Sequence, residues 1–374
     1  MLGQPARVRP YFGYRNAGRL RLTARALRMR EPAWTHTRMV DKLAAMLSQF
    51  ASNEVSGLAV ELEVAGPAGE VRRFPAVSDA EGFVRFDVAV GAGTAAQHDP
   101  SWELVRLHWR NRDGPHSVDA FVLAPGNEQT LAVISDIDDT IVETGAGDLI
   151  RNWRRVIAQM PGDREPVPGA AAFYGRLSGA EAGAAVPAGR RPFFYISSSP
   201  WNLFDYLVAF QKVHQLPQGP IFLRDWDFDR ATLGSAGHKA HKAGAIGDLA
   251  TFYPAMRFAL IGDNTQADAL AYADVVRRHP GRIAAVFIRQ APGADLGPFE
   301  QAALDAIRAA GVELWTGASY EVGADFLARL GFTLGGETTR IVQTIAVAPG
   351  DAEGGAAGGP GAPAPPVDSP GTPA

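Results

Sequence analysis

Three carboxylates and a threonine follow a short apolar run near the middle of this 374-residue sequence. The run begins at Leu131, and the polar residues after it are Asp136, Asp138, Asp139 and Thr140. An apolar run of this length predicts a buried strand of a parallel sheet, so the carboxylates are expected at the strand's carboxyl end, where open α/β sheets bind ligands. Two buried aspartates side by side are costly unless a cation neutralises them, which predicts a site for a hard ion, with Mg²⁺ as the first candidate.

The spacing of Asp136 and Asp138 fits a catalytic pair. Residues two apart in a strand or its exit loop point the same way, so one carboxylate can attack a reacting centre while the other moves a proton. The alternative is an aspartate-rich turn that caps a helix. The apolar strand ahead of the motif favours the catalytic interpretation.

A second apolar strand is predicted over residues 192–196, and it ends in Ser197, Ser198 and Ser199. Hydroxyl groups and free backbone N–H groups at a strand end, just before a helix, form a natural seat for phosphate. A serine turn before a proline-initiated helix explains this segment equally well.

Lys242 is one of only four lysines in the chain, and it is predicted to open a helix. A cation is unfavourable at a helix N-terminus because of the helix dipole. Its place is easier to explain if Lys242 holds a phosphate and the carboxylate of Asp136; Lys239 is the local competitor.

A further buried strand, over residues 256–261, ends in Gly262 and Asp263, with Asp268 five positions later. Here again a buried strand ends in acids. Turn chemistry alone is the alternative for the Gly-Asp pair.

These four segments, in this order, resemble the four motifs of the haloacid-dehalogenase (HAD) superfamily of phosphotransferases. The resemblance implies that Asp136 is the nucleophile that becomes an aspartyl-phosphate and that Asp138 is the general acid and base. The implied metal ligands are Asp136, Asp138 through its carbonyl, Asp263 and Asp268; of the last two, Asp263 would bind directly, whereas Asp268 would bind through water or orient Lys242. The implied phosphate-binding residues are Thr140, Ser197, Ser198 and Lys242.

The flanking residues resemble one branch of that superfamily, the phosphatidate phosphatases of the yeast actin-patch type and their bacterial relatives. The segments that carry this resemblance are Asp136-Ile-Asp-Asp-Thr-Ile, Ile196-Ser-Ser-Ser-Pro-Trp-Asn-Leu-Phe-Asp, Leu223-Arg-Asp-Trp, His241-Lys-x-x-x-Ile and Phe258-x-Leu-Ile-Gly-Asp-x-x-Gln-x-Asp. Asn264-Thr265 departs from the Ser-Gly expected there. The resemblance implies Mg²⁺-dependent hydrolysis of phosphatidate to diacylglycerol and phosphate. Hydrolysis of a soluble phosphate ester is the first alternative, and a non-catalytic membrane-associated adaptor is the second.

The rest of the chain predicts an α/β protein with a HAD-like three-layer parallel sheet preceded by a small antiparallel β-sandwich domain. Residues 1–52 are expected to form a basic N-terminal strand and helix, 53–127 the β-sandwich accessory domain, and 128–340 the HAD-like catalytic domain. The amphipathic stretch at 145–160 is a candidate cap over the site. The Gly-, Ala- and Pro-rich residues 349–374 are expected to be a disordered tail.

Composition limits the partners and the compartment. The chain has no cysteine, which excludes disulfides and thiolate metal sites, and its net charge of −4 gives no general attraction to nucleic acid. Without a signal peptide or a long apolar run, a cytoplasmic protein is expected. The basic N-terminal segment raises the alternative of peripheral contact with an anionic membrane, although a solvated strand face explains it more simply.

Overall fold

The computed structural model describes residues 4–28, 53–66, 69–91, 100–126, 130–141, 166–179, 191–224, 235–330 and 332. The helix predicted near residues 37–50, the amphipathic stretch at 145–160, the loop at 225–229 and the tail at 349–374 lie outside these described residues. Within the described part, no helix is both long enough and apolar enough to cross a membrane.

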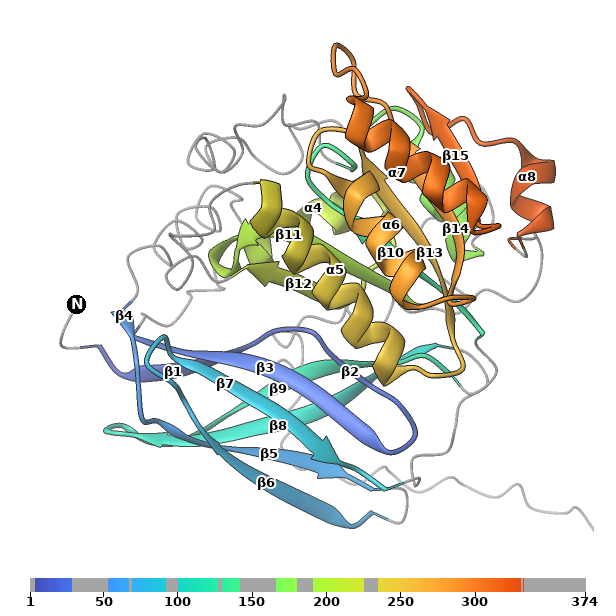
Figure 1. Ribbon diagram of the computed structural model, residues 1–374. Coiled ribbons are helices and arrows are strands. Elements are labelled where there is room, and N and C mark those ends of the chain that lie inside the picture. Colours follow the sequence, from blue (N-terminus) through green and yellow to red (C-terminus); the bar gives the residue numbers. More distant parts are fainter. Residues whose placement is uncertain are drawn as a thin grey trace, which may run out of the picture.

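The first part of the chain forms a nine-stranded sheet that is almost entirely antiparallel (Figure 1). Its strands are β1 (Ala6–Pro10), β2 (Gly13–Arg15), β3 (Arg19–Arg28), β4 (Asn53–Glu54), β5 (Ala59–Ala65), β6 (Val71–Val77), β7 (Phe83–Ala89), β8 (Ser101–Asn111) and β9 (Gly114–Ala124). The main path runs β1-β3-β2-β9-β8-β5-β6, and both β4 and β7 pair with β3.

Strands β1–β3, expected as a separate N-terminal segment, pair into the same sheet as the strands of residues 53–124. Strand β3 pairs with β7 along its length, with Leu22 opposite Phe86 and Ala24 opposite Val84. Alternate residues of β3 are buried in one apolar cluster with residues of β5, β7, β8 and β9. The period-two pattern therefore places one face of β3 in the core of this first domain.

The second part of the chain forms a six-stranded parallel sheet in the order β12-β11-β10-β13-β14-β15. Its strands are β10 (Leu131–Asp136), β11 (Phe193–Pro200), β12 (Ile221–Arg224), β13 (Arg257–Asp263), β14 (Ile283–Arg289) and β15 (Glu313–Gly317). The helices are α3 (Ala170–Ser178), α4 (Phe204–Val213), α5 (Ser235–Phe252), α6 (Asp268–Arg278), α7 (Pro298–Ala309) and α8 (Ala324–Arg329), with a 3₁₀ turn, η2 (Trp201–Leu203).

Helices cover both faces of this parallel sheet. On β10, Val133 packs in one apolar cluster with residues of α3, α4 and α8, whereas its neighbours Ala132 and Ile134 pack in a second cluster with residues of α5, α6 and α7. Because both faces are buried, the strands read as continuous apolar runs. This explains why these strands could be recognised in the sequence as apolar runs.

The strand order fixes where a ligand would bind. Chain order runs outward from β10 through β11 and β12 on one side, and then returns to β13 on the other side of β10. The reversal between β10 and β13 is a topological switch point, and open α/β sheets bind ligands outside the carboxyl ends of the strands at such a point. Asp136 and Asp263 are the last residues of these two strands.

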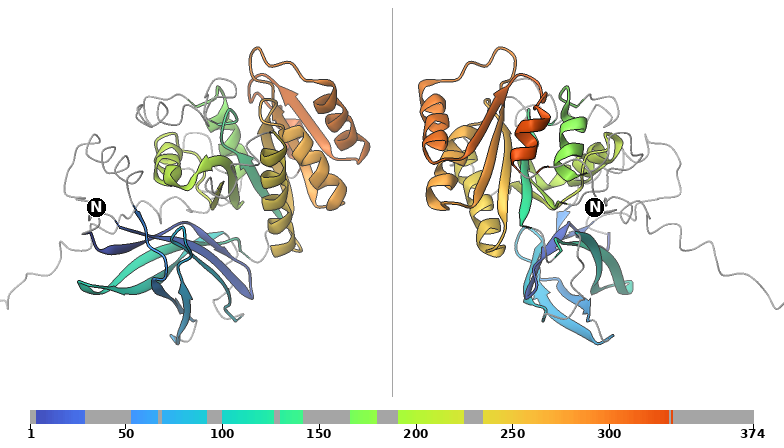
Figure 2. Two further views of the ribbon diagram at one scale, coloured as in Figure 1. Left: turned by 60° about the vertical axis from the view of Figure 1, so that its left-hand side comes forward. Right: turned by 90° about the vertical axis from the view of Figure 1, so that its right-hand side faces the viewer.

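The nine-stranded sheet lies against the part of the chain that forms the parallel sheet (Figure 2). Aromatic side chains meet where the two parts touch. The ring of Tyr14 lies 5.0 Å from that of Phe252 and 5.6 Å from that of Phe222. Asn16 donates a 2.8 Å hydrogen bond to the carbonyl of Phe252, and Arg25 donates a 3.0 Å bond to the side chain of Asn202. The two sheets therefore share a well-packed interface.

Candidate active site

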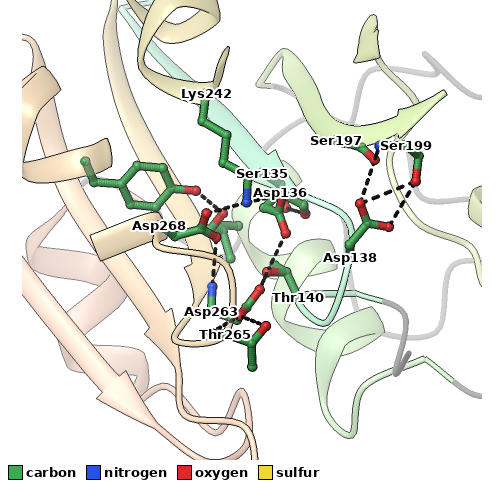
Figure 3. A network of polar contacts seen from close by, with 12 residues as sticks. Ser135, Asp136, Asp138, Thr140, Ser197, Ser199, Lys242, Asp263, Thr265 and Asp268 are labelled. Atoms are coloured by element: carbon green, nitrogen blue, oxygen red, sulfur yellow. Dashed lines mark hydrogen bonds and ion pairs between the residues drawn. The ribbon is translucent and has the colours of Figure 1, made fainter. Parts of the chain in front are cut away.

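The centre of the candidate site is a group of three buried aspartates at the switch point (Figure 3). One carboxylate oxygen from each of Asp136, Asp263 and Asp268 lies within 4.8 Å of the others. The hydroxyl of Thr140 is 3.1 Å from Asp136 Oδ2 and 3.0 Å from Asp263 Oδ2, so it lies between these two carboxylates. The structure thus brings these four residues together.

Lys242 supplies the positive charge of this group. Its side chain is 1% exposed, and its ammonium lies 2.7 Å from Asp136 Oδ1 and forms a second ion pair with Asp268. Helix α5 begins at Ser235, so Lys242 does not open a helix as predicted, and the dipole argument made from the sequence was wrong. Burial between two acids explains the lysine instead.

The Gly-Asp-x-x-x-x-Asp spacing has a direct structural reason. The backbone N–H of Asp263 donates a 3.1 Å hydrogen bond to Asp268 Oδ2, which folds the first turn of α6 back onto the end of β13. A Cβ at Gly262 would collide with the Asp268 carboxylate. Thr265, one of the two residues that depart from the expected pattern, donates from its hydroxyl to Asp263 Oδ1 at 2.5 Å.

The side chain of Asp138 makes its contacts with serines rather than with the three aspartates (Figure 3). Ser197 donates a 2.7 Å hydrogen bond to Asp138 Oδ2, and the hydroxyl of Ser199 lies 3.3 Å from Asp138 Oδ1. Ser198 is buried between them in the strand. Ser199 was not among the predicted site residues, although its two-residue spacing from Ser197 in an extended strand could have identified it.

Burial dominates the electrostatics of the site. It raises the pKa of Asp136 well above the usual value, with Lys242 opposing the rise and the neighbouring acids adding to it. Burial and then the charge of Asp268 raise the pKa of Asp263 to about 7. Burial alone would lower the pKa of Lys242, but Asp136, Asp268 and Asp263 outweigh it and raise that pKa above its ordinary value.

The donor set fits a divalent cation. Three carboxylates against one ammonium leave two negative charges in a buried site when all are ionised. Oxygen-only ligands suit hard ions such as Mg²⁺, and such an ion would offset both the desolvation and the mutual repulsion of the acids. The residues present therefore fit a metal, with Asp136, Asp263 and Asp268 as its holders.

Part of the chain is similar to known proteins. Residues 131–290 match the family model described as the catalytic domain of phosphatidate phosphatase APP1. Phosphatidate phosphatase APP1 of Saccharomyces cerevisiae is 30% identical over 162 residues, which cover 42% of this chain and 26% of the yeast protein. An uncharacterized protein of Schizosaccharomyces pombe, C29B5.04c, is 23% identical over 223 residues, which cover 59% of this chain and 35% of that protein.

The chain thus spans about a quarter to a third of the length of these two relatives. Among solved structures, a β-glucuronidase of Bifidobacterium dentium aligns with a TM-score of 0.23 and 9% identity over 84% of this chain and 43% of that one, a score too low to inform the fold. The four sequence segments that build the site all lie inside the matched range. Residues 131–290 are therefore similar to a catalytic domain of the phosphatidate phosphatase APP1 type.

Proposed function

We propose that this chain is a Mg²⁺-dependent phosphatidate phosphatase with a HAD-like catalytic fold, which cleaves phosphatidate to diacylglycerol and phosphate through an aspartyl-phosphate. The observation that carries the proposal is the buried group of Asp136, Asp263, Asp268 and Lys242 at the switch point of a parallel sheet, within the residues that match the family model. A binding module has no need of such a costly group of charges.

Asp136 is the proposed nucleophile. Its carboxylate attacks the phosphorus of the substrate, a bond forms between the Asp136 oxygen and phosphorus, and the bond from phosphorus to the diacylglycerol oxygen breaks. Lys242, 2.7 Å from Asp136 Oδ1, orients this carboxylate, and the one N–H that it does not direct at Asp136 or Asp268 is offered to the phosphate. Thr140 holds the other Asp136 oxygen from the opposite direction.

Asp138 is the proposed general acid and base. Burial raises its pKa, although the hydrogen bond from Ser197 opposes this, and the raised pKa favours the protonated acid. Asp138 gives its proton to the departing diacylglycerol oxygen. It then takes a proton from the water that attacks the phosphoenzyme, which releases phosphate and restores Asp136.

Mg²⁺, when bound, would neutralise charge on the phosphate oxygens. Its proposed ligands are the carboxylates of Asp136, Asp263 and Asp268 and the backbone carbonyl of Asp138. Ser197 and Ser198 remain proposed contacts of the phosphate, and the hydroxyl of Ser197 would then exchange Asp138 for the substrate.

The arginine-rich N-terminal strands are the candidate surface for contact with an anionic membrane. Five of the seven arginines in residues 6–28 form ion pairs: Arg9 with Asp205, Arg15 with Glu103, Arg19 and Arg21 with Asp87, and Arg25 with Glu54. These pairs favour a structural role for this strand face over binding of anionic lipid. We propose that the protein is cytoplasmic and binds peripherally to membranes that contain its lipid substrate. Sedimentation with phosphatidate-containing vesicles tests this binding.

The direct test is phosphate release from phosphatidate in detergent micelles, with Mg²⁺ and with EDTA. Glycerol 3-phosphate is the matched soluble control, because it carries the same phosphate ester without acyl chains. Magnesium-dependent release that favours the lipid supports the proposal. Release from soluble esters with none from phosphatidate would contradict the lipid assignment, and release undiminished by EDTA would contradict the role of the metal.

A further inference from the structure

The loop after β10 has a backbone conformation that its surroundings must hold in place. Asp139 has a φ of 56°, in the left-handed region that residues with a Cβ rarely adopt. Such a conformation persists where neighbouring groups over-determine it, and it is often found beside functional residues. Asp139 directly precedes Thr140, whose hydroxyl lies between the carboxylates of Asp136 and Asp263.

Arg289 holds this loop from one side. It is the last residue of β14 and only 3% exposed, and it lies opposite Asp263 in the sheet register. Its Nη1 donates a 2.8 Å hydrogen bond to the backbone carbonyl of Asp139. The carbonyl of the left-handed residue Asp139 is therefore fixed by the charged guanidinium of Arg289 at the end of β14.

Tyr320 holds the loop from a second direction. Its hydroxyl donates a 3.0 Å hydrogen bond to the backbone carbonyl of Thr140. Its ring is 3% exposed and stacks on Phe173 of α3, with the centroids 4.9 Å apart and the planes 7° from parallel. Because packing fixes the ring, the hydroxyl has little freedom to move away from the loop.

We propose that Arg289 and Tyr320 are positioning residues of the active site. Arg289 and Tyr320 hold two successive carbonyls, those of Asp139 and Thr140. They thereby fix the turn that places the Thr140 hydroxyl between the carboxylates of Asp136 and Asp263. Neither touches the reacting atoms. The inference rests on the proposed function, and Tyr320 lies beyond the residues that match the family model.

Tyr320→Phe tests the proposal because it removes only the hydroxyl and keeps the stacked ring. Tyr253→Phe is the matched control: Tyr253 is also buried, and its hydroxyl donates a 3.1 Å hydrogen bond to a backbone carbonyl, that of Arg15, at the interface of the two sheets. We expect Tyr320→Phe to lower kcat about tenfold with KM nearly unchanged and to raise the Mg²⁺ concentration for half-maximal activity, and Tyr253→Phe to change neither.

Hydrogen exchange of the metal-free proteins gives a readout that does not depend on turnover. The Ile141 N–H bonds to the Ile137 carbonyl at 2.9 Å across this loop, so exchange at residues 137–141 should be faster in Tyr320→Phe than in the wild type and unchanged in Tyr253→Phe. Arg289→Lys, which keeps the charge but loses the guanidinium geometry, should behave like Tyr320→Phe.

Wild-type kcat together with wild-type exchange in Tyr320→Phe would overturn the role of Tyr320, and the same result in Arg289→Lys would overturn that of Arg289. If Tyr253→Phe lost as much kcat as Tyr320→Phe, the losses would reflect general destabilisation of the protein, and the proposal would also be overturned. If the wild type does not hydrolyse phosphatidate, the proposed function fails, but the exchange comparison still decides whether these two residues hold the loop.

Discussion

Replacing Lys242 by methionine should destabilise the metal-free protein strongly. The substitution keeps much of the side-chain volume but removes the ammonium that pairs with both Asp136 and Asp268, all three of which are at most 1% exposed. Breaking a buried ion pair from one side typically costs about 3–5 kcal/mol because a buried charge is left uncompensated. With two carboxylates affected, we expect the free energy of unfolding to fall by about 3–5 kcal/mol.

Urea unfolding in EDTA at neutral pH measures this change. Lys239→Met is the matched control in the same helix, at a partly exposed position, and it should change the free energy of unfolding by no more than about 0.5 kcal/mol. Adding Asp268→Asn to Lys242→Met removes one of the unpaired charges, so the double variant should be less destabilised than the sum of the single variants. A Lys242→Met protein within about 1 kcal/mol of the wild type would refute the charge argument, because it would mean that these acids need no cation.

Three further predictions address the metal, the glycine and pH. Mg²⁺ should raise the melting temperature of the wild type, because it binds the folded state, and this shift should be largely lost in Asp263→Asn; equal shifts in both would remove that residue from the metal site. Gly262→Ala should lower both stability and activity, since its Cβ would collide with the Asp268 carboxylate, and wild-type melting and turnover would contradict this. Burial, and then nearby positive charges, lower the pKa of His241 from 6.5 to about 4. Between these two pH values the unfolded state binds more protons than the folded state, so the free energy of unfolding should rise with pH, by up to about 1.4 kcal/mol per pH unit. His241→Gln should flatten that part of the stability–pH profile measured by urea unfolding, and an unchanged slope would show that another group causes it.

The parallel sheet could be predicted from the sequence because strands buried on both faces read as continuous apolar runs. The runs before Asp136 and Asp263 are of this kind, and each ends at the residue where the strand ends. The predicted boundary between residues 1–52 and the following strands was harder to judge from the sequence. Alternation in residues 19–28 predicted a strand, but pairing of β3 with β7 joins segments about 60 residues apart, and the sequence pattern alone contains no information about such a partner.

Site residues that stand at the ends of apolar strands could be predicted from the sequence. Residues whose role depends on the direction of the side chain could not. The acids at the strand ends, together with the resemblance to the four motifs, predicted one site for Asp136, Asp263 and Asp268, and the structure places these three carboxylates close together. The Asp138 side chain points to the serines rather than to the three aspartates. The two-residue spacing did not anticipate this, because β10 ends at Asp136 and the regular strand does not continue to Asp138. Tyr320 follows the last strand at a distance from every motif, so only the folded chain brings it to the site.

The measurement that tests the central claim most directly is phosphate release from dispersed phosphatidate by the wild type and by Asp136→Asn, each with saturating Mg²⁺ and each shown to be folded by circular dichroism. Asn keeps the size of the side chain but is a far weaker nucleophile than a carboxylate, so the wild type should release phosphate and the variant should release none above background. Substantial release by the folded variant would contradict the assignment of Asp136 as the nucleophile and with it the proposed mechanism.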